Sequence, residues 1–146
     1  LSKLPALAGA RVGALLAAEP LVARIAGIAA PYPLPAPSVA AALAALAPPA
    51  LARTLALRDG LLAERERVRA ALAALPGIDR VWPSAGNFLL LRCHDAAATF
   101  ARALAGDVLL RDVSGQPGLA GCLRASIGTR ADSDALLAAL AVGGAA

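Results

Sequence analysis

The strongest constraint on the fold is a long charge-free stretch that prolines divide into short pieces. Residues 25–52 carry no charged side chain over 28 positions, and six prolines lie among them, from Pro31 to Pro49. Proline lacks a backbone donor and disfavours helix at the residue before it, so this stretch cannot form one continuous helix. Each piece is also shorter than the ~20 residues that cross a bilayer. The sequence therefore predicts a soluble protein with no membrane partner and an extended connector over residues 30–37.

Short elements are expected on both sides of this connector. The apolar run over residues 12–18 is compatible with a buried strand, and Pro20 suits the first turn of a helix that follows it. After the connector, Ser38 is a good N-cap for a helix over residues 39–47.

A longer helical tract is predicted from Pro49 toward Leu75. Gly60 lies in its middle and weakens the expectation that the helix is continuous. Glutamate and arginine alternate over residues 64–67, and Arg69 follows. Such alternation is typical of a solvated helix face, which is the expected role of these charges.

The pattern changes after Pro76-Gly77 to short strands that alternate with helices. This arrangement predicts an α/β unit in which helices cover one side of a small sheet, with Trp82 over the core. Residues 143–146 are expected to be a frayed end. The expected strands span residues 80–82, 87–92, 108–111 and 122–127, and the expected helices span residues 96–105 and 133–142.

Composition and residue spacing argue against two kinds of binding site, one for nucleic acid and one for a metal ion. The chain has 14 basic and 10 acidic residues, but its arginines are scattered along the sequence and aromatics make up only 3%. Nucleic-acid binding favours clustered basic residues interleaved with aromatics, so no nucleic-acid partner is expected. Cys93, His94 and Cys122 lack the spacing of a metal site. We therefore expect no metal, and reduced thiols in a cytoplasmic protein.

The first thirteen residues place a lysine and an arginine in a glycine- and alanine-rich turn. Lys3 precedes Arg11 by eight positions. Two cations close together in an apolar setting are costly unless an anion joins them. A phosphorylated aldehyde would satisfy both, because its carbonyl carbon can bond the amine and its phosphate can bind the guanidinium group. The alternatives are that Lys3 is an ordinary surface lysine and that Arg11 caps a carbonyl.

A second pair of cations lies near the other end of the chain. Arg111 and Arg124 each lie at the end of an apolar run or inside one, thirteen residues apart. Two guanidinium groups that converge from adjacent strands would bind a phosphate or carboxylate through paired hydrogen bonds. The alternative for Arg111 is a surface ion pair with Asp107 or Asp112.

Three motifs together carry a resemblance to a known family. They are Ser-Lys-x-x-x-Leu-Ala-Gly-x-Arg-x-Gly from Ser2, Ala-Pro-Tyr-Pro-Leu from Ala30, and Gln-Pro-Gly-Leu-x-Gly-Cys-Leu-Arg-x-x-Ile-Gly-Thr from Gln116. They resemble fold-type I pyridoxal-phosphate aminotransferases, in particular the histidinol-phosphate aminotransferase family. The family usually has Ala and an aromatic residue after the lysine, where this chain has Leu4-Pro5.

The resemblance implies a role for each cation. Lys3 would form the Schiff base with pyridoxal 5'-phosphate, Arg11 would bind the cofactor phosphate, and Ser2 would assist. Arg111 and Arg124 would hold the phosphate of the substrate. The implied reaction moves an amino group between histidinol phosphate and 2-oxoglutarate or glutamate, in histidine biosynthesis, in an enzyme that is a homodimer when full length.

The resemblance also implies the organisation of the chain. It corresponds to the C-terminal part of a fold-type I enzyme: the end of the large cofactor-binding domain over residues 1–35, bridging helices over 36–76, and a small α/β domain over 77–146. With no initiator Met, the chain is expected to be a fragment that is inactive alone. The alternatives are another fold-type I enzyme, such as a phosphothreonine decarboxylase or an aromatic aminotransferase, and a non-catalytic alanine-rich helical interaction module.

Overall fold

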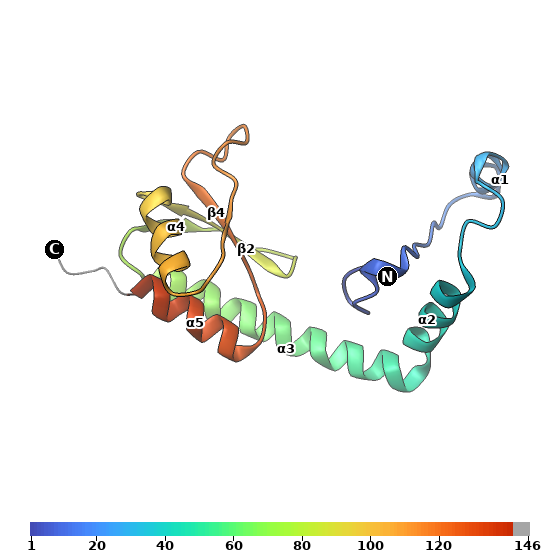
Figure 1. Cartoon of the computed structure of the whole chain (residues 1–146), viewed down its shortest axis with the longest axis horizontal. Coiled ribbons are helices and arrows are strands. Elements are labelled where there is room, and N and C mark those ends of the chain that lie inside the picture. Colours follow the sequence, from blue (N-terminus) through green and yellow to red (C-terminus); the bar gives the residue numbers. More distant parts are fainter. Residues whose placement is uncertain (142–146) are drawn as a thin grey trace. The chain divides into compact units, whose positions relative to one another are not determined.

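The computed structural model describes residues 1–141 and separates the chain into two compact units (Figure 1). Unit 1 is Leu1–Arg58, and unit 2 begins at Asp59, within the longest helix. The predicted frayed end, residues 143–146, lies outside the described residues. The helices that belong wholly or partly to unit 1 are the 3-10 helix η1 (Ala8–Ala10), α1 (Glu19–Ile28), α2 (Ala36–Leu46) and the first part of α3 (Pro48–Ala73).

Unit 1 differs from the sequence expectation in two places. Residues 12–18 form no strand, and nearly all of them are exposed. A strand needs a neighbour for its backbone hydrogen bonds, and no described strand pairs with this run. Helix α2 begins at Ala36 with Pro35 as its N-cap, so Ser38 lies inside the helix and does not cap it. The fixed φ of proline favours the first helical turn, which lets the helix start before the serine.

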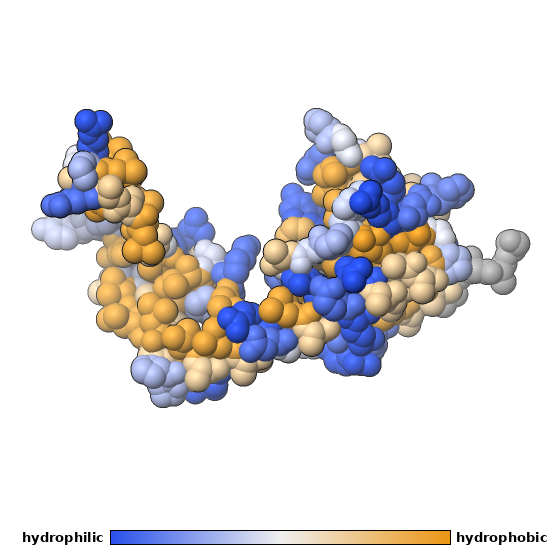
Figure 2. All heavy atoms as spheres, turned by 180° about the vertical axis from the view of Figure 1, so that it is seen from behind, coloured by the Kyte–Doolittle hydropathy of each residue, from blue (hydrophilic) through white to orange (hydrophobic). Residues whose placement is uncertain are grey.

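Large apolar side chains remain at the surface of unit 1. Figure 2 shows hydrophobic residues gathered on the surface of its helices. Leu16 and Tyr32 are each 97% exposed, and Ile28 is 86% exposed. Among the described residues no single helix is long and apolar enough to cross a membrane, and α2 and α3 meet that test only as a pair bent by 71°.

Unit 2 contains a four-stranded antiparallel sheet. Its strands are β1 (Ile78–Val81), β2 (Phe88–Cys93), β3 (Arg111–Asp112) and β4 (Cys122–Ser126), in the spatial order β1-β2-β4-β3. Helices α4 (Ala96–Ala105) and α5 (Arg130–Ala141) complete the unit. The expected small sheet with helices is confirmed, although the third strand is shorter than predicted and starts at Arg111.

The core lies on one face of this sheet. Leu89 and Leu91 of β2 are fully buried, as is Leu123 of β4. They form one core with buried residues of α3, α4 and α5, which include Val68, Leu72, Ala103, Leu136 and Leu140. Because side chains alternate along a strand, the residues between these leucines point to the opposite face. The core residues of the unit 2 helices pack on the leucine side, so the other side is called the helix-free face of unit 2.

The sequence suggested that the charged segment of α3 is a solvated helix face. In the structure, its side chains also make contacts with other elements of unit 2. Arg67 donates to Glu64 at 2.6 Å on its own helix and to Asp134 of α5 at 2.6 Å. Arg130 of α5 donates to Asp134 at 3.2 Å. Arg65 is 11% exposed and donates to the carbonyl of Gly86 at 3.1 Å. These contacts fasten α3 to α5 and to the loop between β1 and β2, while helix α3 continues through Gly60 without a break.

Candidate functional site

The Lys3 segment folds into a closed loop within unit 1. The nitrogen of Leu1 donates to the carbonyl of Val12 at 3.1 Å, and the amide of Leu7 donates to the carbonyl of Leu1 at 3.2 Å. The loop therefore carries Lys3 and Arg11 on one short, tied segment. The first acidic residue of the chain is Glu19, so the loop holds two cationic side chains and no carboxylate.

Leu4-Pro5 is accommodated by a turn directly after the lysine. The amide of Ala6 donates to the carbonyl of Lys3 at 3.0 Å, and Ala6 has a φ of 56°. The donor that proline lacks is not the one that closes this turn, because that hydrogen bond comes from the next residue. The proline therefore does not prevent the chain from closing the loop around the lysine.

The three side chains of this loop that are expected to bind the cofactor, Ser2, Lys3 and Arg11, are all exposed. Lys3 has no carboxylate partner within the described residues, and Ser2 has no side-chain hydrogen bond there. Arg11 has a φ of 54°, and its guanidinium group donates to the carbonyl of Ala8 at 3.3 Å. The capping alternative for Arg11 is thus observed, but it uses one of the five donors that a guanidinium group carries.

Arg111 and Arg124 are brought together by the pairing of β3 with β4. They occupy directly opposite positions in the antiparallel register, although they are thirteen residues apart in sequence. Opposite residues of such a pair have Cβ atoms about 4.5–5.5 Å apart. Like charges on directly opposite residues are destabilising, and a bound anion would offset that repulsion. The register therefore places the two residues side by side on one face of the sheet.

Neither arginine of this pair has a carboxylate partner. Arg111 is exposed, and the carboxylate of Asp112 accepts from the amide of Ser114 at 2.8 Å instead. This hydrogen bond lowers the pKa of Asp112. The Nε atom of Arg124 is buried and has no hydrogen-bond partner. The surface ion pair considered for Arg111 is therefore not observed.

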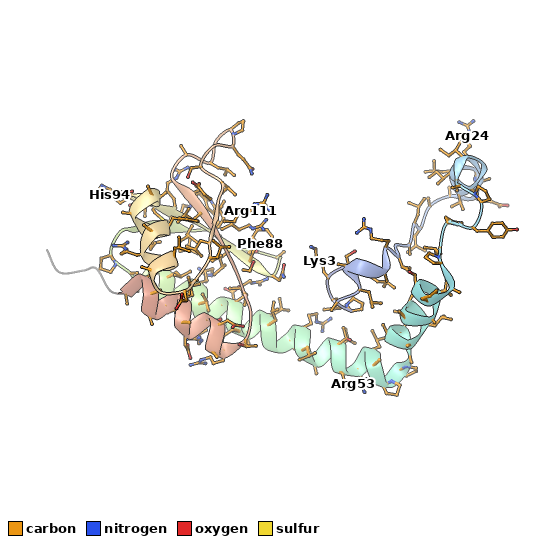
Figure 3. The ribbon with its side chains drawn as sticks, in the orientation of Figure 1. Lys3, Arg24, Arg53, Phe88, His94 and Arg111 are labelled. Carbon is orange, nitrogen blue, oxygen red and sulfur yellow. The ribbon has the colours of Figure 1, made fainter. Side chains whose placement is uncertain are left out.

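An aromatic residue completes this site, and the sequence reasoning did not assign it. The guanidinium carbon of Arg124 lies 5.1 Å from the ring centre of Phe88. Figure 3 labels Phe88 and Arg111 at the same end of the sheet, with His94 at the other end. Stacking on a ring fixes the plane of a guanidinium group while its edge donors stay available. An apolar residue at a strand start gives no sequence signal for this role.

Trp82 also differs from its expected role over the core. It is half-buried, and the guanidinium carbons of Arg80 and Arg92 lie 4.9 Å and 5.4 Å from its ring centre. The arginines that look scattered in the sequence thus gather with aromatics on the helix-free face. Among the described residues, no group of three or more His, Cys, Asp or Glu side chains could hold a metal ion.

The family model for class I and II aminotransferases matches residues 1–140. The chain belongs to this family. The match covers the Lys3 loop and all four strands of unit 2. It confirms the resemblance that the three sequence motifs carried.

Individual relatives show the same relationship. A histidinol-phosphate aminotransferase from Stenotrophomonas maltophilia is 49% identical over 140 residues, which are 96% of this chain and 38% of that protein. The structure of a histidinol-phosphate aminotransferase from Sinorhizobium meliloti in complex with pyridoxal-5'-phosphate is 30% identical, with a TM-score of 0.80 over 96% of this chain and 38% of that one. An L-threonine-O-3-phosphate decarboxylase structure from Porphyromonas gingivalis is 29% identical, with a TM-score of 0.80 over 95% of this chain and 43% of that one.

This aminotransferase-family chain therefore spans less than half the length of the relatives it matches. Its fold is the expected fragment of a fold-type I enzyme, with a small helix-covered sheet at the C-terminal side.

Proposed function

We propose that this chain is part of a pyridoxal-phosphate-dependent histidinol-phosphate aminotransferase. The observation that carries the proposal is the Arg111–Arg124 pair: the two residues occupy opposite register positions, and neither has a carboxylate partner among the described residues. A phosphate monoester offers several oxygens to such a pair, and arginine binds it through paired, charge-assisted hydrogen bonds. The reaction transfers an amino group between histidinol phosphate and glutamate or 2-oxoglutarate.

The Lys3 loop fits a phosphate-bearing cofactor. It is short and closed, it contains no carboxylate, and most donors of Arg11 remain available. We assign the cofactor phosphate to Arg11, with a hydrogen bond from the Ser2 hydroxyl. Bound pyridoxal phosphate supplies the electron sink for the reaction. The Lys3 amine would hold the cofactor and would carry a proton as a positioned general base.

The remaining parts of the proposal concern the whole enzyme. Residues 1–35 end its large cofactor-binding domain, residues 36–76 bridge the domains, and residues 77–146 form the small domain. The complete enzyme is a cytoplasmic homodimer, and the 146-residue chain alone is inactive. Its length relative to the Stenotrophomonas protein supports the last point, because 62% of that protein has no counterpart here (100% − 38%).

A chimera tests the proposal directly. The matching 140 residues of the Stenotrophomonas enzyme are replaced by this chain, and transamination of histidinol phosphate is measured. Lys3→Ala should lower kcat by about 10²–10⁴, the usual contribution of a general base. Arg124→Gln should raise KM for histidinol phosphate about tenfold to a hundredfold, because a charged hydrogen bond contributes about 1.5–3 kcal/mol.

Arg69→Gln is the matched control for the loss of an arginine charge, since Arg69 is already paired with Glu66 at 2.8 Å. It should leave both kinetic constants unchanged. A folded, dimeric chimera that binds pyridoxal phosphate but transfers no amino group would refute the proposed activity.

A phosphothreonine decarboxylase is the second candidate, and the similarity to the Porphyromonas decarboxylase supports it. The same arginine pair would hold the phosphate of that substrate. The two reactions are separated by their products, because the decarboxylase releases carbon dioxide and needs no 2-oxo acid. The chimera is therefore also assayed with phosphothreonine and with an unphosphorylated aromatic amino acid. The helical interaction module predicts no absorbance band from bound cofactor and no effect of Lys3→Ala.

A further inference from the structure

The helix-free face of unit 2 carries a second arginine pair. Arg80 of β1 and Arg92 of β2 lie directly opposite each other in the antiparallel register. This repeats the arrangement of Arg111 and Arg124 on β3 and β4. Cys122 lies opposite Arg92, so Arg124 is the diagonal neighbour of Arg92, about 7–8 Å away. The two pairs therefore form one diagonal band across the sheet.

The second pair has no acidic partner within the described residues. Neither Arg80 nor Arg92 takes part in an ion pair there, and the Nε atom of Arg92 is buried without a hydrogen-bond partner.

Trp82 holds both guanidinium groups of the second pair. Its ring centre lies 4.9 Å from the guanidinium carbon of Arg80 and 5.4 Å from that of Arg92. The ring screens part of each charge and limits the orientations of both groups. It offers no acceptor for their N–H donors, because the indole nitrogen is a donor only. An oxyanion would supply the missing acceptors and offset the repulsion between the two charges.

We propose that Arg80 and Arg92, held by Trp82, form a second oxyanion site beside the Arg111–Arg124 pair. The group that it takes is a phosphate or a carboxylate, bound through the guanidinium edges. The site is separate from the pair assigned to the substrate, and it depends on neither Lys3 nor the cofactor. This phosphate or carboxylate belongs either to a free anion or to an acidic side chain in another part of the enzyme.

Trp82 makes the site directly measurable, because it is the single tryptophan of the chain. The 146-residue chain is titrated with inorganic phosphate at constant ionic strength, with chloride as the balancing anion, and Trp82 emission is recorded. A saturable change is expected. Arg92→Gln and Arg80→Gln should each weaken the apparent affinity at least tenfold, since each removes one charged hydrogen-bonding partner. Arg92→Lys keeps the charge but lacks the planar, two-nitrogen edge of the guanidinium group. Its apparent phosphate affinity should therefore lie between that of the glutamine variants and that of the unmodified chain.

Two matched controls separate this site from its neighbours. Arg69→Gln removes an arginine that is already ion-paired and should leave the titration unchanged. Arg124→Gln removes the arginine that stacks on Phe88 and should also leave the Trp82 response in place. A response that is linear in phosphate, that survives both Arg80→Gln and Arg92→Gln, or that Arg124→Gln abolishes would overturn the proposal.

The source of the anion is decided in the chimera. A saturable emission change of the chimera with phosphate that Trp82→Phe removes identifies a site for a free anion. Loss of the response there, with the isolated chain still responding, identifies a site filled by a carboxylate of the enzyme. A chimera without aminotransferase activity leaves the Trp82 titration of the isolated chain unaffected, so the two proposals fail separately.

Discussion

The one-sided core of unit 2 makes a quantitative prediction about two adjacent leucines of β2. Leu91 is fully buried, and its register neighbours are Val81 on β1 and Leu123 on β4. Leu91→Ala removes three carbons, which forfeits about 2.4 kcal/mol at about 0.8 kcal/mol each. Both neighbouring strands hold the site open, so a cavity term raises the loss to about 3–4 kcal/mol. Leu90 is half-buried on the helix-free face, and Leu90→Ala should cost only about 1 kcal/mol.

Thermal unfolding of the 146-residue chain measures both variants, with Trp82 emission and far-UV circular dichroism as probes. For a unit of this size, Leu91→Ala should lower the midpoint by about 15–25 °C and Leu90→Ala by about 5 °C. Leu109→Ala is the exposed control, because that side chain is 77% exposed, and it should change the midpoint little. Equal losses for Leu90→Ala and Leu91→Ala would refute the assignment of the core to one face of the sheet.

Three further predictions concern charge, backbone and surface. Contacts with Arg67 lower the pKa of Glu64 from 4.5 to about 2, so Glu64 contributes stability that is full above about pH 4.5 and is lost as the pH falls toward 2. Urea midpoints of Glu64→Gln and the unmodified chain should therefore differ at pH 7 and converge near pH 2, and a constant difference would contradict the coupling. Gly121→Ala should lower the free energy of unfolding by about 1–2 kcal/mol, because the φ of Gly121 is +71° and a Cβ there would lie 3.3 Å from the carbonyl oxygen of Cys93. Gly115→Ala is the control in the same urea assay: a Cβ there meets open space, so the change should be neutral. The exposed apolar side chains of unit 1 should make the isolated chain self-associate, which sedimentation detects, and a compact monomer at all concentrations would count against this.

Local sequence patterns predicted most elements of unit 2. The helix at residues 96–105 was predicted with its observed bounds, and Asp95 caps it by accepting from the amide of Ala98 at 2.9 Å. Local patterns were weaker where an element depends on distant partners. The apolar run at residues 12–18 forms no strand, because hydrophobicity alone does not supply a neighbouring strand. Gly60 did not interrupt α3, because one glycine costs only about 1 kcal/mol in a helix of this length.

The sequence by itself determined the family, and it supplied the candidate site residues. The lysine, the arginines and the small residues around them stand at fixed spacings, and a spacing can be recognised without a structure. The sequence also suggested that Arg111 and Arg124 act together, but only the tertiary structure showed that Arg80 and Arg92 face each other. The register between β3 and β4 sets Arg111 opposite Arg124, and the register between β1 and β2 sets Arg80 opposite Arg92. Strand pairing joins residues far apart in the chain, and its choice of partner depends on the packing of the whole unit. For that reason Arg80 and Arg92 look like scattered charges in the sequence and become neighbours only in the folded sheet.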